Sequence, residues 1–213
     1  LALVLALLLL IGAWEWAALT GLAGTGQRGI YVGLVALVMA ALYFLPQWHL
    51  GALFWWLAVL VWLAIAVIEA SYTSGERGKP RWQTPLMLSG FLLLPAAWLA
   101  MVELHQEHPA FLLYLLAISA AADSFAYFVG KRFGKNKLAP HLSPGKTREG
   151  VIGGLVGVFM VSLAFVYLID MPAGIAVPFV LLGLLCGLVS VVGDLFESLM
   201  KREVGAKDSG WII

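Results

Sequence analysis

The stretch IAVPFVLLGLLCGLVSVVGDL, residues 175–195, decides the fold of this chain because it is long and apolar enough to cross a lipid bilayer. A transmembrane helix needs about 20 mostly apolar residues to cross about 30 Å of hydrocarbon. A helix is expected because lipid offers no partners to backbone N–H and C=O groups. Of the 213 residues, 62% are hydrophobic and only 12% are charged, whereas a soluble domain has about 25% charged residues.

Six further apolar runs have similar lengths, so we expect seven spans. They lie at residues 1–18, 30–45, 50–70, 84–102, 110–129, 151–169 and 175–195. The expected fold class is all-α, a polytopic transmembrane helical bundle that forms one integral-membrane domain over residues 1–213. The chain opens inside an apolar run without Met and stops without a recognisable ending, so we expect a fragment cut at both ends.

The loops between these spans divide sharply by charge. All 13 Lys and Arg residues follow the first, third, fifth or seventh span. The alternate loops carry Glu103, Glu107, Asp170 and three histidines, with no Lys or Arg. Basic residues collect on the cytoplasmic side of membrane proteins. The sequence therefore predicts a protein of a bacterial-type cytoplasmic (inner) membrane, with residues 131–150 and the C-terminal tail facing the cytoplasm.

Asp123 lies inside the fifth predicted span, about 10 Å from its cytoplasmic end at 1.5 Å per residue. It shares a helix face with Ser119 and Tyr127 at i, i+4 spacing. A carboxylate at this depth is expensive unless it faces protein, water or a cation, so it indicates a functional site. The structural alternatives are a carboxylate that pairs with a neighbouring helix and one that snorkels through thinned lipid.

The segment GDLFESLMKR, residues 193–202, carries polar groups where the seventh span leaves the bilayer. On a helix, one face presents the following residues together: Asp194, Glu197, Ser198, Lys201 and Arg202. The ordinary end of a transmembrane helix explains Lys201 and Arg202, because basic residues there contact anionic lipid headgroups. It does not explain Asp194 and Ser198, so a binding face remains the second interpretation.

The loop at residues 131–150 contains SPGKTREG, residues 143–150, which resembles the end of a nucleotide-binding P-loop. A P-loop needs a glycine five positions before Gly145, and that position is Pro140, which has no N–H to donate. No strand pattern precedes the stretch, so a P-loop is excluded. Lys146 and Thr147 can still bind a phosphate, and Glu149 can orient a cation or a lysine. The alternative is a patch that only holds lipid headgroups.

Two blocks of this sequence resemble the phosphatidate cytidylyltransferase (CDP-diacylglycerol synthase) family. The first is residues 122–154, from ADSFAY to VIGG. The second follows the family's Ser-x-x-Lys-Arg-x4-Lys-Asp-x-Gly pattern, which these residues match: Ser198, Lys201, Arg202, Lys207, Asp208 and Gly210. The chain stops at Ile213, before the family's further metal-binding carboxylate.

The resemblance implies transfer of CMP from CTP to phosphatidic acid, giving CDP-diacylglycerol and pyrophosphate. It implies that Mg²⁺, held partly by Asp194, neutralises the phosphates. The implied catalytic residues are Asp194, Ser198, Lys201, Arg202, Lys207 and Asp208. The expected substrate-binding residues are Asp123, Ser143, Lys146, Thr147 and Glu149. Because one carboxylate is a small ligand set for Mg²⁺, we expect the chain as given to be inactive by itself.

The competing hypothesis is a cation-coupled secondary transporter that uses Asp123 and Asp194. It predicts inverted repeats, and the sequence has none. A lipid kinase is a third hypothesis, which the two blocks disfavour. The expected partners are CTP, phosphatidic acid and membrane lipids, with a homodimer as an open option and no nucleic acid.

Overall fold

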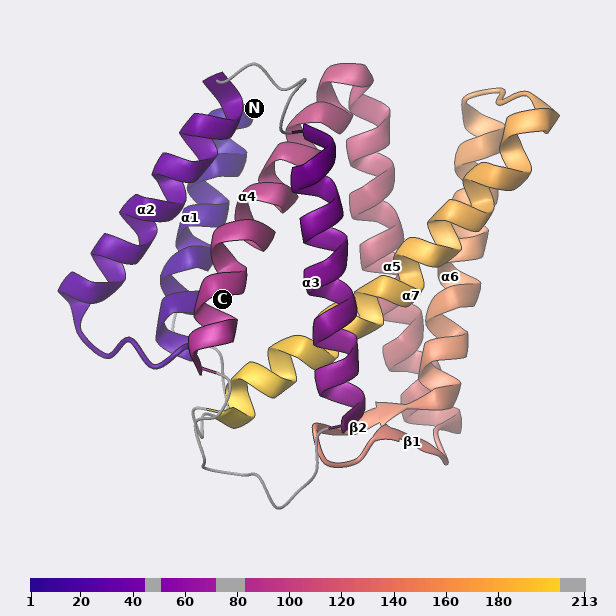
Figure 1. Ribbon diagram of the computed structural model, residues 1–213. Helices are drawn as coiled ribbons and strands as arrows, with labels where there is room; N and C mark the ends of the chain where they lie inside the picture. Colours follow the sequence, from indigo (N-terminus) through magenta and orange to yellow (C-terminus); the bar gives the residue numbers. More distant parts are fainter. Residues whose placement is uncertain (45–50, 72–82, 204–213) are drawn as a thin grey trace. The chain divides into compact units, whose positions relative to one another are not determined.

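The computed structural model describes residues 1–44, 51–71 and 83–203 (Figure 1). Its helices are α1 (Ala2–Leu19), α2 (Thr25–Phe44), α3 (Gly51–Ser71), α4 (Gln83–Glu107), α5 (Pro109–Phe133), α6 (Arg148–Leu168) and α7 (Ala173–Glu203). Two strands, β1 (Lys137–Ala139) and β2 (Ser143–Thr147), lie between α5 and α6. Seven of the described helices are long and apolar enough to cross a membrane, which confirms the predicted polytopic helical bundle.

Several helices are longer than the apolar runs that predicted them. Helix α2 begins at Thr25 instead of residue 30, and α5 and α7 continue to Phe133 and Glu203. The last turns of α5 and α7 each carry a Lys-Arg pair. Cations near a helix C-terminus interact favourably with the helix dipole, so these helices continue beyond the apolar run.

Internal contacts divide the chain into two compact units. The first comprises Leu1–Gln106 with Glu197–Ile213, and the second comprises Glu107–Phe196. The single membrane domain over residues 1–213 stays a prediction.

The first unit has a core formed by α1, α2 and α4. Its buried members are Ala13, Ala17, Tyr31, Val35, Met39, Leu94, Trp98, Leu99 and Val102. The Trp16 indole N–H donates to the Leu86 carbonyl at 3.0 Å, and the Tyr31 hydroxyl donates to the Met87 carbonyl at 3.0 Å. These two hydrogen bonds connect α1 and α2 to α4. Lipid offers no hydrogen-bond partner for the polar ends of aromatic side chains, so these groups bond to a neighbouring helix.

The second unit is built on a close contact between α5 and α6, which run side by side in opposite directions (Figure 1). Small residues on α6 make this contact possible. A Cβ atom added at Gly153 would lie 2.5 Å from Val129 Cβ, and one at Gly154 would lie 2.9 Å from the Ala122 carbonyl oxygen. Small residues such as these glycines let membrane helices approach closely.

Residues 137–147 differ from the sequence prediction of an irregular loop. They form an antiparallel hairpin in which Lys137 pairs with Thr147 and Ala139 pairs with Ser143. The statement that no strand precedes the Gly-Lys-Thr sequence is therefore wrong, because β1 does. The P-loop is still excluded, because Gly-Lys-Thr lies within β2 itself and not in a loop after a strand.

We expect Gly153→Ala to destabilise the protein, because the added methyl would overlap Val129. Overpacking of this kind costs about 1–3 kcal/mol. Gly33→Ala is the matched control: Gly33 lies in a helix with open space around it, and alanine favours helix by about 1 kcal/mol. Thermal unfolding of both variants in detergent checks this expectation. A midpoint for Gly153→Ala at or above wild type would contradict the close contact.

Candidate functional site

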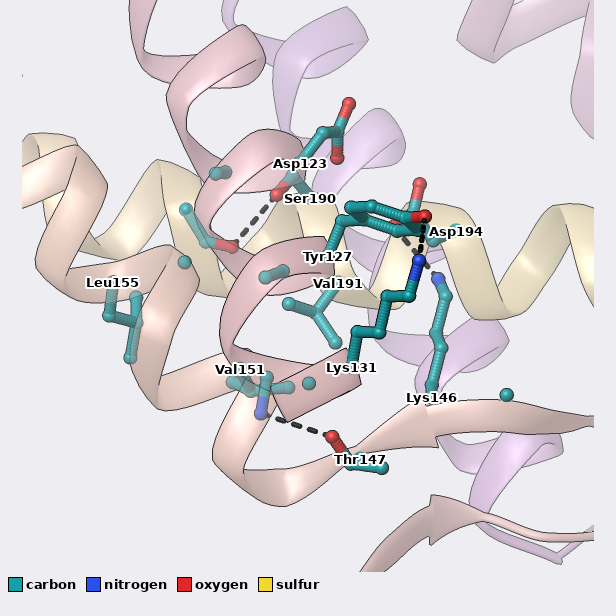
Figure 2. Close-up of a pocket in the computed structure, with 17 residues that line it drawn as sticks. Asp123, Tyr127, Lys131, Lys146, Thr147, Val151, Leu155, Ser190, Val191 and Asp194 are labelled. Atoms are coloured by element: carbon teal, nitrogen blue, oxygen red, sulfur yellow. Dashed lines mark hydrogen bonds and ion pairs between the residues drawn. The ribbon is translucent and has the colours of Figure 1, made fainter. Parts of the chain in front are cut away.

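The second unit contains a pocket of about 340 Å³ between α5, β2, α6 and α7 (Figure 2). Its size falls in the range of small-molecule sites, about 300–1,000 Å³. Most of its wall is made of small and aliphatic side chains. The polar and charged side chains that line it are Asp123, Tyr127, Lys131, Lys146, Thr147, Ser190 and Asp194.

Lys146 and Asp194 form an ion pair inside this pocket. The Lys146 Nζ atom lies 2.8 Å from Asp194 Oδ2, and Figure 2 shows the two side chains meeting from β2 and α7. The Nζ atom is shielded from solvent, yet it makes no hydrogen bond among the described residues. The short distance with unfavourable hydrogen-bond geometry makes this contact a charge–charge pair. The sequence predicted both residues as site residues, and the structure brings them together.

Asp123 lies on α5 and lines the same pocket. Asp194 and Lys146 line this pocket as well. The two carboxylates come from α5 and α7, which are distant in sequence, and share the pocket with Lys146. This placement favours the functional interpretation of Asp123.

Thr147 positions the hairpin against both helices. As the N-cap of α6, its Oγ1 accepts a hydrogen bond from the Gly150 N–H at 3.2 Å. Its side chain also lies against α5, where a Cβ at Gly130 would be 3.1 Å from the same Oγ1. An N-cap threonine satisfies a helix N–H that has no partner within the helix. Thr147 thus fixes the place where β2 ends and presents Lys146 to the pocket.

Glu149 anchors the other side of the hairpin. Its carboxylate accepts hydrogen bonds from the backbone N–H groups of Lys135 and Asn136 at 3.1 and 3.2 Å. The Asn136 side-chain amide donates to it as well, at 2.7 Å. Glu149 is not among the residues that line the pocket. These contacts favour a supporting role over the predicted orientation of a bound cation.

Tyr127 and Lys131 belong to the pocket although the sequence analysis did not select them as site residues. The Lys131 Nζ donates to the Tyr127 hydroxyl at 3.2 Å, and Figure 2 shows both side chains beside the Lys146–Asp194 pair. A signal was present in the sequence, because Asp123, Tyr127 and Lys131 follow one another at i, i+4, i+8 on one helix face.

The remaining predicted site residues lie elsewhere or beyond the described ranges. Ser143 begins β2 and is partly buried outside the pocket lining. Ser198, Lys201 and Arg202 lie on the last turns of α7, in the first unit, and Lys201 pairs with Glu197 at 2.8 Å. Their part in a joint site stays a prediction. Lys207 and Asp208 lie outside the described residues.

The pocket offers two carboxylates for a divalent cation, Asp123 and Asp194. The described residues hold no cluster of three or more His, Cys, Asp or Glu side chains that could bind a metal. Mg²⁺, however, usually keeps several water ligands and is held by one or two carboxylates together with substrate phosphates. The residues present therefore fit Mg²⁺ that arrives with a phosphate-bearing substrate, and they do not form a preformed all-protein cage.

Seven helices long and apolar enough to span a membrane define an integral membrane protein, and the pocket of its second unit contains the Lys146–Asp194 ion pair. The sequence model of the cytidylyltransferase family matches residues 1–213. The chain belongs to this family and is a nucleotidyltransferase. The transporter hypothesis is not supported.

Relatives named phosphatidate cytidylyltransferase occur in several bacteria. The Pseudomonas aeruginosa protein is 39% identical over 205 residues, which cover 93% of this chain and 73% of that protein. The Staphylococcus aureus protein (strain COL) is 35% identical over 191 residues, covering 85% of this chain and 69% of that protein. The Haemophilus influenzae protein is 45% identical over 105 residues, which are 48% of this chain and 36% of that protein.

We expect Glu149→Gln to loosen the hairpin. The glutamine NH₂ group would face the backbone N–H groups that now donate hydrogen bonds to the carboxylate, and two donors cannot bond to each other. Hydrogen–deuterium exchange should become several-fold faster at Lys135 and Asn136. Glu107→Gln, which removes a charge from an exposed site at the end of α4, is the control and should leave the hairpin unchanged. Unchanged exchange in Glu149→Gln would mean that its carboxylate does not hold the hairpin.

Proposed function

We propose that the pocket of the second unit is the site where CMP is transferred from CTP to phosphatidic acid, giving CDP-diacylglycerol and pyrophosphate. The observation that carries this proposal is the Lys146–Asp194 ion pair, 2.8 Å long, within a pocket of a cytidylyltransferase-family chain. A cation and a carboxylate at one point suit a reaction in which anionic phosphates and a divalent metal meet.

In this reaction an oxygen of the lipid phosphate attacks the α-phosphorus of CTP. A new P–O bond forms, the bond from the α-phosphorus to the bridging oxygen breaks, and its electron pair leaves with pyrophosphate. Such transfers need positioning and charge stabilisation more than a covalent protein group. No nucleophilic side chain is required in the pocket.

The role of Lys146 follows from its shielded ammonium group. Lys146 is already desolvated by its surroundings, so it loses little further hydration when a phosphate oxygen replaces the Asp194 oxygen as its partner. A lysine holds phosphate as a point charge. We assign Lys146 to a phosphate of the substrates and Asp194 to the metal that accompanies them.

Mg²⁺ would be held by Asp194 and Asp123 together with substrate oxygens, and when bound it would neutralise charge on the triphosphate. The phosphate-binding and catalytic roles that the family pattern implies for the following residues stay predictions: Ser198, Lys201, Arg202, Lys207 and Asp208. Thr147 and Glu149 would act by holding the hairpin, and Ser143 by its place in β2.

The distribution of basic residues supports an active site on the cytoplasmic side of an inner membrane. Lys131 and Lys146 belong to the predicted cytoplasmic segment 131–150, and loops rich in Lys and Arg remain in the cytoplasm. CTP would then enter the pocket from the cytoplasm, and the lipid would enter from the bilayer.

The test is formation of labelled CDP-lipid by the full-length protein in nanodiscs with CTP, phosphatidic acid and Mg²⁺. Asp194→Asn should abolish turnover at ordinary Mg²⁺ concentration and leave thermal stability in place. Asp170→Asn is the matched control, since Asp170 has a positive φ of 51° that asparagine also adopts. Wild-type kinetics for Asp194→Asn would refute the metal assignment.

Lys146→Ala should weaken substrate binding, because a charge-assisted phosphate contact is worth about 1.5–3 kcal/mol, or roughly 10- to 150-fold in affinity. Lys146 lies in the hairpin and not in the close contact between α5 and α6, so the variant should remain folded. Initial rates against both substrates measure the effect. Michaelis constants and rates within about twofold of wild type would mean that Lys146 does not bind a substrate phosphate and is only a structural partner of Asp194.

A further inference from the structure

Lys131 differs from Lys146 in its electrostatic surroundings. Lys146 is paired with the Asp194 carboxylate. Lys131 has no carboxylate partner among the described residues, and its Nζ donates to the neutral Tyr127 hydroxyl at 3.2 Å. Of the two lysines that line the pocket, Lys131 therefore keeps its positive charge uncompensated and available to an anion.

Lys131 also lies at the end of a membrane-spanning helix. It belongs to the last turn of α5, and the aromatic residues around it are exposed. These exposed residues are Tyr127 (59%), Phe128 (67%) and Phe133 (58%). Aromatic side chains collect at the membrane–water interface, at the level of the lipid headgroups. These aromatic residues favour a position at headgroup depth for Lys131, which also lines the pocket.

Tyr127 fixes the position of this ammonium group. The Tyr127 hydroxyl accepts the Lys131 hydrogen bond, and Lys131 Nζ lies 5.4 Å from the centre of the Tyr127 ring. A lysine has a flexible stem, so a neutral partner can hold the ammonium in place without cancelling its charge. An acidic partner would hold the ammonium equally well but would compete with an incoming phosphate.

We propose that Lys131, held by Tyr127, is the recognition site for the phosphate headgroup of the membrane lipid, whereas Lys146 serves the nucleotide side of the pocket. The inference rests on the proposed function for the identity of the lipid, phosphatidic acid. The lipid phosphate reaches Lys131 from the interface without leaving headgroup depth, and its acyl chains stay in the bilayer. The recognised chemistry is a phosphate monoester joined to an apolar chain.

The test is equilibrium binding of dihexanoyl phosphatidic acid to the full-length protein in detergent, without CTP or Mg²⁺, followed by calorimetry. We expect Lys131→Met to weaken binding about tenfold, in line with loss of one charge-assisted contact. Lys131→Arg should restore most of the affinity, and Tyr127→Phe should weaken binding about two- to threefold. CTP affinity should stay within about twofold of wild type in all three variants.

Arg132→Met is the matched control, because it removes the adjacent positive charge, on the same turn of α5 but outside the pocket lining. It should change lipid affinity less than twofold. Equal losses for Lys131→Met and Arg132→Met would overturn the proposal in favour of a general basic surface. An equal loss of CTP affinity in Lys131→Met would overturn it in favour of a nucleotide contact.

Inorganic phosphate and dihexanoylglycerol test whether the site recognises the whole lipid or only its phosphate or its diacylglycerol portion. Each should bind far more weakly than dihexanoyl phosphatidic acid, and inorganic phosphate binding as tight as the lipid would overturn the lipid assignment. Binding is measured without turnover, so the binding result can be interpreted even if the protein does not transfer CMP. A thermal midpoint equal to wild type shows that Lys131→Met is folded, and retained lipid affinity in that folded variant would refute the site.

Discussion

The close approach of α5 and α6 sets the position of the residues that line the pocket. No side chain separates the two helices at Gly153 and Gly154, where an added Cβ would meet Val129 and the Ala122 carbonyl. Because the backbones are this near, the short chain between the helices closes as a hairpin against their ends. The hairpin then carries Lys146 to the same pocket as Asp123 of α5.

The opposite charges in the lining explain how four charged side chains can share a pocket at the end of membrane-spanning helices. Its lining contains two ammonium groups, on Lys131 and Lys146, and two carboxylates, on Asp123 and Asp194. An isolated charge inside a membrane protein is expensive, and pairing reduces this cost. The described lining is neutral in sum, and Mg²⁺ would offset part of the negative charge that the substrate phosphates bring. Charge balance therefore favours binding of the nucleotide together with the metal over binding of the nucleotide alone.

The sequence predicted the helical bundle well, because span length and backbone satisfaction leave few alternatives in lipid. It also predicted Asp123, Lys146 and Asp194, whose charges are anomalous in or near apolar runs. It missed the β-hairpin, because strands of three and five residues carry no periodic signal. It assigned Glu149 and Thr147 to ligands, although both carry hydrogen bonds to backbone amides. The sequence alone does not distinguish a side chain that hydrogen-bonds to the backbone from one that binds a ligand.

The most direct test of the account is a double-mutant cycle on Lys146 and Asp194, measured as kcat/KM for CDP-lipid formation by the full-length protein. Residues that act as one unit in catalysis show strongly non-additive losses. We predict that Lys146→Ala with Asp194→Asn loses no more activity than the worse single variant. If the two losses multiply, the residues act independently, and the ion pair is not the centre of the site.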